Sequence, residues 1–466
     1  MRLFIANRGE IAARVARAAR ELGLGVVGAF TDVDAGAFHT TAVDEAVPLG
    51  SADGYLSVER LVAAAKSAGC TAVHPGYGFL AENATFAQAV IDAGLSWVGP
   101  SPAAIAAMGD KQRARALVMA AGVPLVPSGV AAGFPALVKA AAGGGGRGMR
   151  VVHDAAALAA AEQAASSEAM AAFGDGTVYV ERLVEGARHV EVQVLGDSRG
   201  KIVSLGTRDC SLQRRHQKLV EEAPAPGLAP ATRDAMELAA LNAARAVAYE
   251  GAGTVEFLLD PSGAFYFIEM NTRVQVEHPV TELVTGIDIV VEQLRVAMGE
   301  SAADPTGARG HAIECRVIAE DPQQGFVPSP GRLVRFRPPS GPGVRVDAGV
   351  AEGSEVTTAY DSLLAKVVVH APNRDLARAR MAQALGAFEI AGVFTTAALC
   401  RELVLHDDFA ALRIHTRWLE AFMETRPPAA PVVAALAAAA LGHASSPGLP
   451  GRVAIPTPWT SIKDWR

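Results

Sequence analysis

Two glutamates stand where a metal ion bound to phosphate would need them. Segments 253–260 and 264–271 have strand-like composition and are separated by a Pro-Ser-Gly turn, which predicts a β-hairpin. If the turn is centred on its Ser-Gly pair, Glu256 lies directly opposite Glu269, with Cβ atoms about 4.5–5.5 Å apart. Two carboxylates at that distance repel, so a cation is expected between them. Oxygen ligands from Glu256, Glu269 and Asn271 suit Mg²⁺ bridging nucleotide phosphates; two incidental glutamates on a solvated strand face are the alternative.

Polar residues continue at every second position beyond this hairpin. The row consists of Glu269, Asn271, Arg273, Gln275 and Glu277. In an extended segment these side chains share one side. There, Arg273 is suited to hold an oxyanion through two hydrogen bonds while Glu277 removes a proton from it. A surface edge strand would give the same alternation, but a buried opposite face is indicated by Met270, Val274 and Val276.

A run of four glycines, 143–146, follows Lys139 within the segment 137–152. Glycines let backbone N–H groups approach a polyphosphate closely. The G-x-x-x-x-G-K-[ST] pattern of a P-loop is absent and the chain returns into a strand, so a mobile flap is expected. A plain flexible hairpin explains the glycines equally well.

A basic segment, 208–218, ends in His216 and Lys218. These two residue types suit the binding of small anions, although an exposed basic loop is the common alternative. Only seven of the 42 basic residues are lysines, so each lysine that the chain retains is of interest.

The composition excludes several classes of protein. The chain has 466 residues, of which 50% are hydrophobic and 20% charged, and these values are those of a globular protein of several domains. The net charge of −7 argues against a general nucleic-acid binder. The four cysteines form no C-x-x-C pair, and neither a signal peptide nor a membrane-spanning run is recognisable, so a cytoplasmic location is expected.

Hydrophobic periodicity divides the chain into regions. Residues 1–100 alternate short apolar runs with helical patterns, which predicts βαβ units around a parallel sheet. The first helix is expected to place Arg14 outward. Antiparallel hairpins and one long helix, 231–248, are expected within 189–269. A small lid is expected at 124–184, and the Pro-rich, Ala-rich stretch after Glu424 is interpreted as a linker or the start of a further domain.

Several motifs together resemble the biotin carboxylase component of biotin-dependent acyl-CoA carboxylases, which has an ATP-grasp fold. They are Ile5–Ala12, His74–Leu80 with Glu82-Asn83, Met108–Lys111, the glycine run, Arg188–Glu191, Gln213–Lys218 with Glu221–Pro224, and Phe267–Pro279. The resemblance covers about residues 1–423. It implies an α/β protein with a Rossmann-like N-terminal domain (1–110), a connecting helix (111–123), a mobile glycine-flap lid (124–184), a central catalytic part (185–300), an α+β C-terminal domain (301–423) and a tail (424–466).

The resemblance also implies roles for individual residues. It places ATP at Lys111, Leu137, Lys139, Gly144, Gly145, Gly146, Met149, Glu181, Arg182, Val184, His189, Gln213, His216, Leu258 and Glu269. It makes Glu256, Glu269 and Asn271 ligands of Mg²⁺ or Mn²⁺ at two sites. Bicarbonate is assigned to Lys218, Arg273, Gln275 and Val276, and the catalytic groups are Arg273, Glu277, Lys218 and Arg345. Biotin is placed near Tyr77 and Arg345.

The implied reaction has two steps. Glu277 activates bicarbonate to attack the γ-phosphate of ATP, which gives carboxyphosphate, and this decomposes to CO₂ and phosphate before biotin N1 attacks CO₂. The sequence has no Ala-Met-Lys-Met biotinylation motif, so the carrier is expected on another chain or on an extension. The expected partners are a biotin carboxyl carrier, a carboxyltransferase and a second copy of this chain. The segment 456–466 resembles the stretch that comes after this domain in large α-subunits for propionyl-CoA or methylcrotonyl-CoA.

Three departures from the family pattern stand out. Residues 128–133 are short where the family carries a helix, Ala141 and Ala142 replace serine and glycine, and Arg182 replaces a lysine. Two other functions therefore stay open. One is a catalytically weak scaffold subunit of a carboxylase complex, and the other is a different bicarbonate-phosphorylating ATP-grasp ligase, such as half of a carbamoyl-phosphate synthetase.

Overall fold

The computed structural model describes residues 1–129, 133–140 and 149–427. Residues 1–422 form one compact unit, and a second unit begins at Met423. The glycine run with Ala141 and Ala142, and most of the tail, lie outside the described residues. No helix in the described ranges combines the length and apolar character needed to cross a membrane.

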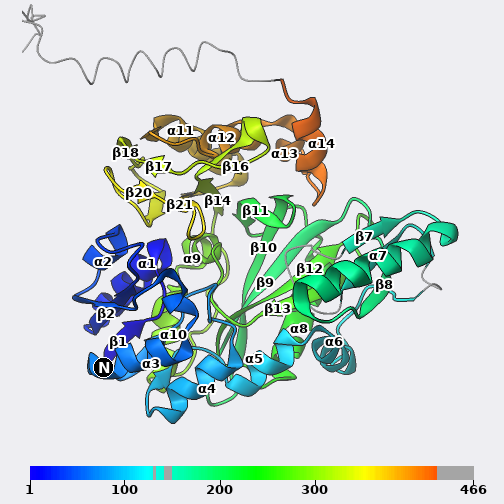
Figure 1. Cartoon of the computed structure of the whole chain (residues 1–466). Helices are drawn as coiled ribbons and strands as arrows, with labels where there is room; N and C mark the ends of the chain where they lie inside the picture. The colour runs from blue at the N-terminus through cyan, green and yellow to red at the C-terminus, as the bar shows by residue number, and fades with distance from the viewer. Residues whose placement is uncertain (130–132, 141–148, 428–466) are drawn as a thin grey trace, which may run out of the picture. The chain divides into compact units, whose positions relative to one another are not determined.

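The N-terminal region is built on the parallel sheet that the periodicity predicts (Figure 1). Its strand order is β3-β2-β1-β4-β5, and every neighbouring pair is parallel. The strands are β1 (Arg2–Ile5), β2 (Gly25–Phe30), β3 (Glu45–Pro48), β4 (Ala72–His74) and β5 (Ser96–Trp97). The helices of this region are α1 (Gly9–Glu21), α2 (Phe38–Thr41), α3 (Val58–Ser67), α4 (Ala84–Asp92), α5 (Pro102–Gly109) and α6 (Lys111–Ala120).

Helix α1 corrects one expectation from the sequence. Arg14 does not point to solvent but is buried, with Nη2 2.8 Å from Oε1 of Glu282 and 2.6 Å from Oδ1 of Asp288. The prediction failed because helical periodicity carries no information about partners that are distant in the chain. Two carboxylates more than 260 residues away in the chain offset the desolvation of this guanidinium.

An antiparallel sheet of eight strands forms the centre of the unit, in the order β13-β12-β9-β10-β11-β14-β21-β19. Its strands are β9 (Arg188–Gly196), β10 (Ile202–Arg214), β11 (Gln217–Ala223), β12 (Gly251–Leu259), β13 (Phe265–Asn271), β14 (His311–Ile318), β19 (Val344–Ala348) and β21 (Leu363–Ala371). The predicted long helix is α8 (Pro230–Arg245), three residues shorter at its end than expected. Helices α9 (His278–Thr285) and α10 (Ile289–Ala297) follow the hairpin.

The segment predicted to form a lid contains a three-stranded sheet, β7-β6-β8, and one long helix. These elements are β6 (Ala136–Ala140), β7 (Met149–Val152), β8 (Val178–Arg182) and α7 (Ala155–Phe173). Alternate residues of β6 are buried against this helix, in a small apolar cluster that includes Val138 and Leu158. The other face of β6 carries Leu137 and Lys139, which are half-buried.

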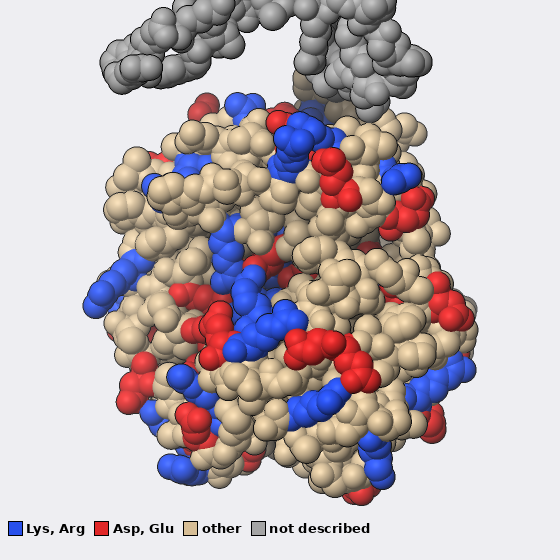
Figure 2. Space-filling model, turned by 90° about the vertical axis from the view of Figure 1, so that its left-hand side faces the viewer, with Lys and Arg blue, Asp and Glu red and all other residues tan. Residues whose placement is uncertain are grey.

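The C-terminal region packs helices α11 (Arg374–Ala387) and α12 (Ala397–Leu405) against β14 and β21. Short paired strands lie beside them, namely β15 (Glu320–Asp321), β16 (Val327–Pro328), β17 (Gly331–Arg332), β18 (Arg335–Arg337), β20 (Glu355–Val356) and β22 (Glu389–Ala391). The last helices are α13 (Asp407–Ala410) and α14 (Trp418–Thr425). On the face shown in Figure 2, acidic and basic side chains gather side by side across the middle of the molecule.

Candidate active site

The predicted hairpin is present, and Glu256 pairs with Glu269 as expected. Near the turn, however, Leu259 pairs with Phe265, one residue away from the predicted register. A shift between Glu256 and Phe257, at Ile268, restores the predicted pairing. The correct pairing therefore results from two deviations that compensate each other.

The metal-ligand candidates lie together at this point of the sheet. Nδ2 of Asn271 donates to Oε1 of Glu256 at 2.9 Å, and both residues are buried. Glu269, which is more exposed than these two residues, lies directly opposite Glu256 in the strand pairing. Two carboxylates in register and one amide are a donor set that fits Mg²⁺ or Mn²⁺, provided the Asn271 amide turns its oxygen inward.

Lys218 is buried among three carboxylates. Its Nζ lies 2.6 Å from Oε2 of Glu191, 2.9 Å from Oε1 of Glu256 and 2.5 Å from Oε1 of Glu277. Burial alone would lower the pKa of Lys218, but these three carboxylates raise it well above its usual value. The lysine is therefore a fixed positive charge, and the alternative of an exposed basic loop does not hold for Lys218.

Glu277 is held from its second side by Arg316. Nη2 of Arg316 lies 3.1 Å from Oε2 of Glu277, and Nε lies 2.5 Å from Oε1 of Glu221. Burial would raise the pKa of Glu277, but Lys218 and then Arg316 outweigh burial and hold this pKa well below its usual value. In this arrangement Glu277 is an ionised and weak base.

The pairing of β10 with β11 has two register shifts, and the one next to Lys218 decides which side chains face this cluster. Gln213 pairs with Lys218, but Leu212 pairs with Val220, so Leu219 is an extra residue. Without that bulge, Lys218 and Glu221 would point to opposite faces. The segment 208–218 is thus mostly strand, closed by a tight turn at Arg215 and His216, whose φ values are 47° and 67°.

Beyond Asn271 the chain leaves the strand, which corrects the expectation of one extended segment to Glu277. Arg273 is nevertheless close to the cluster: its Nη2 donates to Oδ1 of Asn271 at 3.0 Å, and its Nε lies 2.8 Å from Oε2 of Glu82. Nε2 of Gln275 donates to Oε1 of Glu256 at 2.8 Å. Val274 is buried as predicted, whereas Val276 is half-buried.

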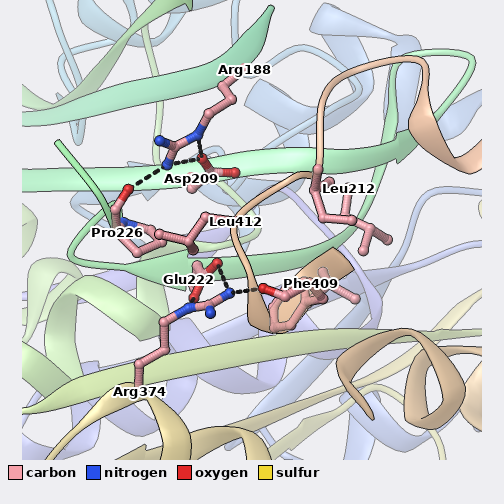
Figure 3. A pocket seen from close by; sticks show the side chains of 10 residues that line it. Arg188, Asp209, Leu212, Glu222, Pro226, Arg374, Phe409 and Leu412 are labelled. Atoms are coloured by element: carbon pink, nitrogen blue, oxygen red, sulfur yellow. Dashed lines mark hydrogen bonds and ion pairs between the residues drawn. The ribbon is translucent and has the colours of Figure 1, made fainter. Parts of the chain in front are cut away.

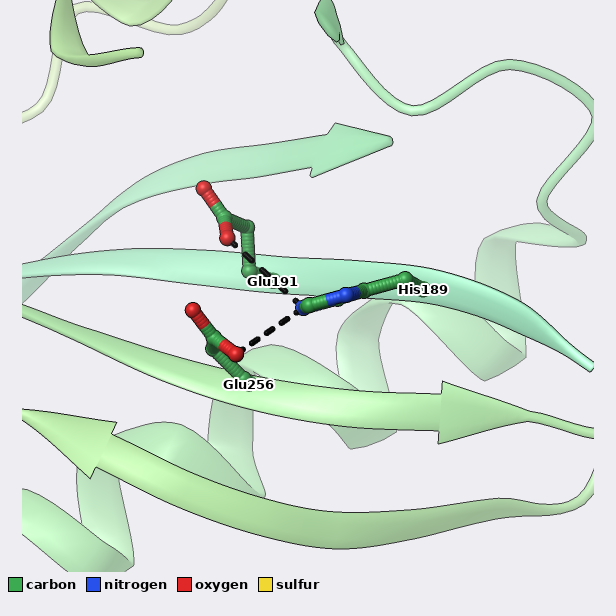
Figure 4. Close-up of side chains that lie close together, drawn as sticks. All are labelled: His189, Glu191 and Glu256. Carbon is green, nitrogen blue, oxygen red and sulfur yellow. Dashed lines mark ion pairs between the residues drawn. The ribbon is translucent and has the colours of Figure 1, made fainter. Parts of the chain in front are cut away.

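His189, Glu191 and Glu256 approach one another on β9 and β12, as Figure 4 shows. Nε2 of His189 lies 3.0 Å from Oε2 of Glu256 and 3.9 Å from Oε2 of Glu191. Burial opposes the charge on His189, but Glu256 prevails and raises its pKa. Nε2 of Gln213 lies 3.2 Å from Nδ1 of His189, whereas His216 is exposed at the turn.

Cations and one acid line the lid side of the site. Nζ of Lys139 lies 2.7 Å from Oε2 of Glu181, and Arg115 pairs with the other oxygen of this carboxylate. Lys111 interacts electrostatically with Lys139 and Glu181. Burial lowers the pKa of Lys111, and the charge of Glu269 opposes that change. Met149 pairs with Lys139 across β6 and β7.

Apolar residues predicted near adenine fall into one cluster. Val184 packs with Leu258 and Tyr266, together with Val126 and Ala187. Leu137 pairs with Glu181 across β6 and β8. Nη2 of Arg182 lies 3.2 Å from Oδ2 of Asp260, so the arginine that replaces the family's lysine has a partner outside this cluster.

The two residues predicted near biotin lie in a second charged cluster. Nη2 of Arg345 lies 2.6 Å from Oδ2 of Asp347, and Nη1 lies 2.7 Å from Oε2 of Glu282. The Tyr77 hydroxyl donates to Glu10, whose Oε1 lies 3.2 Å from Nζ of Lys366. Lys366 also donates to the backbone oxygen of Val276 at 2.8 Å, which links this cluster to the loop that carries Glu277.

No individual role was predicted for four residues of the site, although one stands in a quoted motif and one begins the basic segment: Glu82, Arg208, Arg316 and Lys366. Nε of Arg208 lies 2.5 Å from Oε1 of Glu191, so it fixes a partner of Lys218. The scarcity of lysines was a signal that applies equally to Lys366, which is buried. Nothing in the sequence around Arg316 indicated that this residue would contact the site.

A small cavity lies on the opposite face of the sheet (Figure 3). It is lined by Arg188, Asp209 and Glu222, the chain neighbours of residues that face the site. Its volume of about 10 Å³ is room for one water molecule at most. Arg188 and Arg374 are already paired there, with Asp209 and Glu222. The cavity is therefore no candidate for a nucleotide.

Comparison with known sequences decides the family. Residues 1–105 match the family described as biotin carboxylase, N-terminal domain, and residues 314–421 match the biotin carboxylase C-terminal domain. The intervening residues 110–304 match the carbamoyl-phosphate synthase L chain, ATP binding domain. A biotin carboxylase of Nostoc sp. is 46% identical over 439 residues, which are 90% of this chain and 98% of the relative. The chain belongs to the biotin carboxylase family.

Other biotin carboxylases and carboxylase subunits support this assignment. The biotin-dependent acyl-coenzyme A carboxylase alpha3 subunit of Mycobacterium leprae is 48% identical over 443 residues, covering 90% of this chain and 74% of that protein. The biotin carboxylase domain dimer of Hydrogenobacter thermophilus 2-oxoglutarate carboxylase, solved with MgADP, ADP and bicarbonate, is 44% identical. It has a TM-score of 0.86 and covers 90% of this chain and 97% of that one. These matches confirm the predicted ATP-grasp biotin carboxylase fold.

Proposed function

We propose that this chain catalyses the ATP-dependent carboxylation of biotin by bicarbonate, the first half-reaction of a biotin-dependent carboxylase. The observation that carries the proposal is the buried Glu277 carboxylate between Lys218 and Arg316, beside the Glu256–Glu269 hairpin. Biotin carboxylases that match nearly their whole length to this chain support it. Neither the scaffold nor the carbamoyl-phosphate synthetase alternative has comparable support, because the domains on both sides of the ATP-binding region are those of biotin carboxylase.

The nucleotide occupies the space between the lid sheet and the hairpin in this proposal. Lys139 and Lys111 hold phosphate oxygens, so Glu181 exchanges its contact with Lys139 for one to the nucleotide. Val184 and Leu258 pack against adenine. Glu256, Glu269 and Asn271 hold Mg²⁺ or Mn²⁺, which neutralises phosphate charge as it develops. Further nucleotide contacts are assigned to Gly144, Gly145, Gly146, Met149, Arg182, His189, Gln213 and His216.

Bicarbonate binds between Arg273, Gln275 and Lys218, near the Val276 backbone. Because Lys218 holds Glu277 weakly basic at rest, bicarbonate must draw the ammonium group toward itself. Loss of that contact raises the basicity of Glu277, which then takes the bicarbonate proton. The nucleophile is thus generated only when substrate is in place.

Carboxyphosphate forms by attack on the γ-phosphate and decomposes to CO₂ and phosphate. The phosphate takes the ureido proton of biotin, whose N1 attacks CO₂. Arg345 stabilises the developing ureido oxyanion, and Tyr77 lies on the approach to it. In the structure Arg345 is fully paired with Asp347 and Glu282, so biotin must compete with one of these carboxylates.

The division into a Rossmann-like domain, lid, central part and C-terminal domain at the expected boundaries is part of the proposal. Biotin is presented by a carrier, and a carboxyltransferase accepts the carboxyl group. The relatives named as carboxylase subunits support these partners in general. A homodimer is proposed because a relative was solved as one. A cytoplasmic location is supported by four unpaired, buried cysteines in the described residues.

The test is release of ADP by purified chain with MgATP and bicarbonate, with and without free biotin. Biotin-stimulated turnover that requires bicarbonate is the expected result. ATP binding without turnover would favour the scaffold function. Turnover that depends on an amine and not on biotin would favour the carbamoyl-phosphate synthetase alternative.

A further inference from the structure

Behind Glu277, two more glutamates face each other inside the sheet. Glu221 on β11 pairs directly with Glu314 on β14, and both side chains are completely buried. Residues paired in this way have Cβ atoms about 4.5–5.5 Å apart, so their carboxyl groups are within reach of each other. Two ionised carboxylates at that distance, without water, would repel strongly.

The hydrogen bonds around this pair are incomplete in a specific way. Oε1 of Glu221 accepts from Nε of Arg316 at 2.5 Å. Among the described residues, Oε2 of Glu221 and both oxygens of Glu314 have no hydrogen-bond partner. A buried carboxylate with no donor is very costly, whereas a protonated carboxyl group needs only one acceptor. The unpartnered oxygen of Glu221 is such an acceptor.

The neighbouring cations do not change this conclusion. Arg316 is already divided between Glu221 and Glu277, and Lys218 is held by three other carboxylates. From β21, Lys366 is held by Glu10 and the backbone oxygen of Val276. From α9, His278 is kept neutral because burial lowers its pKa. Burial raises the pKa of Glu221 to about 7 and that of Glu314 well above its usual value.

We propose that Glu221 and Glu314 share a proton at neutral pH, and that this pair positions Arg316 against Glu277. Glu314 holds the proton and donates to Glu221, which keeps one negative charge for Arg316. Arg316 is then balanced between one carboxylate on each side. A second charge on the pair would draw the guanidinium away from Glu277.

This arrangement matters for the proposed function, on which its catalytic part rests. When bicarbonate draws Lys218 away, Arg316 is the remaining cation that orients the Glu277 carboxylate. Glu221 fixes Arg316 through Nε and leaves Nη2 for Glu277. Glu221 and Glu314 are therefore positioning residues, and neither touches substrate.

The experiment compares three isosteric variants by infrared difference spectroscopy and steady-state kinetics. Glu314→Gln replaces the protonated acid by a neutral amide, so kcat is expected to stay within about threefold while the buried carboxylic-acid C=O band at pH 7 disappears. Glu221→Gln removes the anchor of Arg316, so kcat is expected to fall about tenfold or more with the KM for ATP unchanged. Glu222→Gln is the control, because that residue faces the other side of the sheet and is ionised against His311 and Arg374. It is expected to leave the C=O band in place.

Each result tests a separate part of the proposal. A wild-type spectrum without the C=O band, or a band that persists in Glu314→Gln, would overturn the shared proton. Equal losses of kcat in Glu314→Gln and Glu221→Gln would overturn the division of roles. If the wild-type chain has no bicarbonate-dependent ATP cleavage, the proposed function fails, while the infrared band still decides whether the pair holds a proton.

Discussion

Nζ of Lys218 lies 2.5 Å from Oε1 of Glu277, so the proposed base is bound by the cation that must leave it before it can act. Arg316 holds the other carboxylate oxygen at 3.1 Å. Burial would favour protonation of Glu277, but Lys218 and Arg316 outweigh it and lower its pKa. In the proposed mechanism, Glu277 therefore stays a weak base until an anion competes for Lys218.

Replacing Glu277 with Gln should abolish bicarbonate-dependent ATP cleavage while ATP still binds. The amide cannot accept a proton, and general-base catalysis is typically worth about 10²–10⁴-fold in rate. ADP release and nucleotide affinity, measured on the same sample, test this expectation. Activity within a few-fold of wild type would show that another group removes the proton.

Replacing Lys218 with Met should destabilise the protein as well as inactivate it. Removing one partner of a buried ion pair costs about 3–5 kcal/mol, because the carboxylates of Glu191, Glu256 and Glu277 stay buried. Lys201→Met is the matched control. Lys201 also donates to the backbone oxygen of Ala302 at 2.7 Å, but its carboxylate partner Asp304 is 87% exposed, and such ion pairs contribute about 1 kcal/mol or less. Urea unfolding of both variants at pH 7 measures the difference. Equal losses would contradict the buried charge cluster.

The ATP-grasp fold and most of the residue roles were implied by the resemblance to biotin carboxylase, whereas other features followed from local periodicity and fixed spacing. The parallel N-terminal sheet and the Glu256–Glu269 pairing are examples. The pairing was nevertheless predicted for an incomplete reason, because a bulge at Ile268 compensates for an unexpected register at the turn. Periodicity cannot reveal a bulge, since one extra residue leaves each half of a strand with its normal alternation.

Contacts between residues that are far apart in the chain could not be predicted from the sequence, for a different reason. Arg316 meets Glu277 and Glu221 only because β14 lies beside β11, and no spacing in the chain encodes that neighbourhood. The same holds for Arg14, a buried residue that forms ion pairs with Glu282 and Asp288, both far away in the chain. Charged residues that are buried by distant partners look like surface residues in a helical or strand pattern.

Replacing Arg345 with Lys should separate the two half-steps of the proposed reaction. Lysine cannot reproduce the planar fork, and removing one oxyanion donor typically costs about 10²–10³-fold in rate. Biotin-stimulated ADP release should therefore fall by about that factor, while the biotin-independent ATPase stays near the wild-type rate. Arg17→Lys is the control, because Arg17 contacts the same Asp347 at 3.0 Å and is half exposed. An equal effect of both variants would mean that the Asp347 contacts, and not biotin, explain the loss.

The shared proton predicts an unusual pH dependence of stability. Folding raises the pKa of Glu314 above its ordinary value near 4.5. At any pH between the pKa of the unfolded state and that of the folded state, the folded protein therefore binds more protons than the unfolded protein. The free energy of unfolding must then fall as pH rises above about 4.5. Glu314→Gln removes this penalty, so its stability relative to wild type should increase from pH 5 to pH 9 and show no gain at pH 4.

Glu222→Gln is the control and should show the opposite trend. His311 and Arg374 outweigh burial and lower the pKa of Glu222, so the ionised carboxylate stabilises the folded state once the pH is above this lowered pKa. The variant should therefore lose stability relative to wild type as pH rises, and lose no stability at low pH. Urea unfolding midpoints across this pH range measure both trends. A constant offset between Glu314→Gln and wild type at every pH would show that Glu314 is not a proton-holding acid.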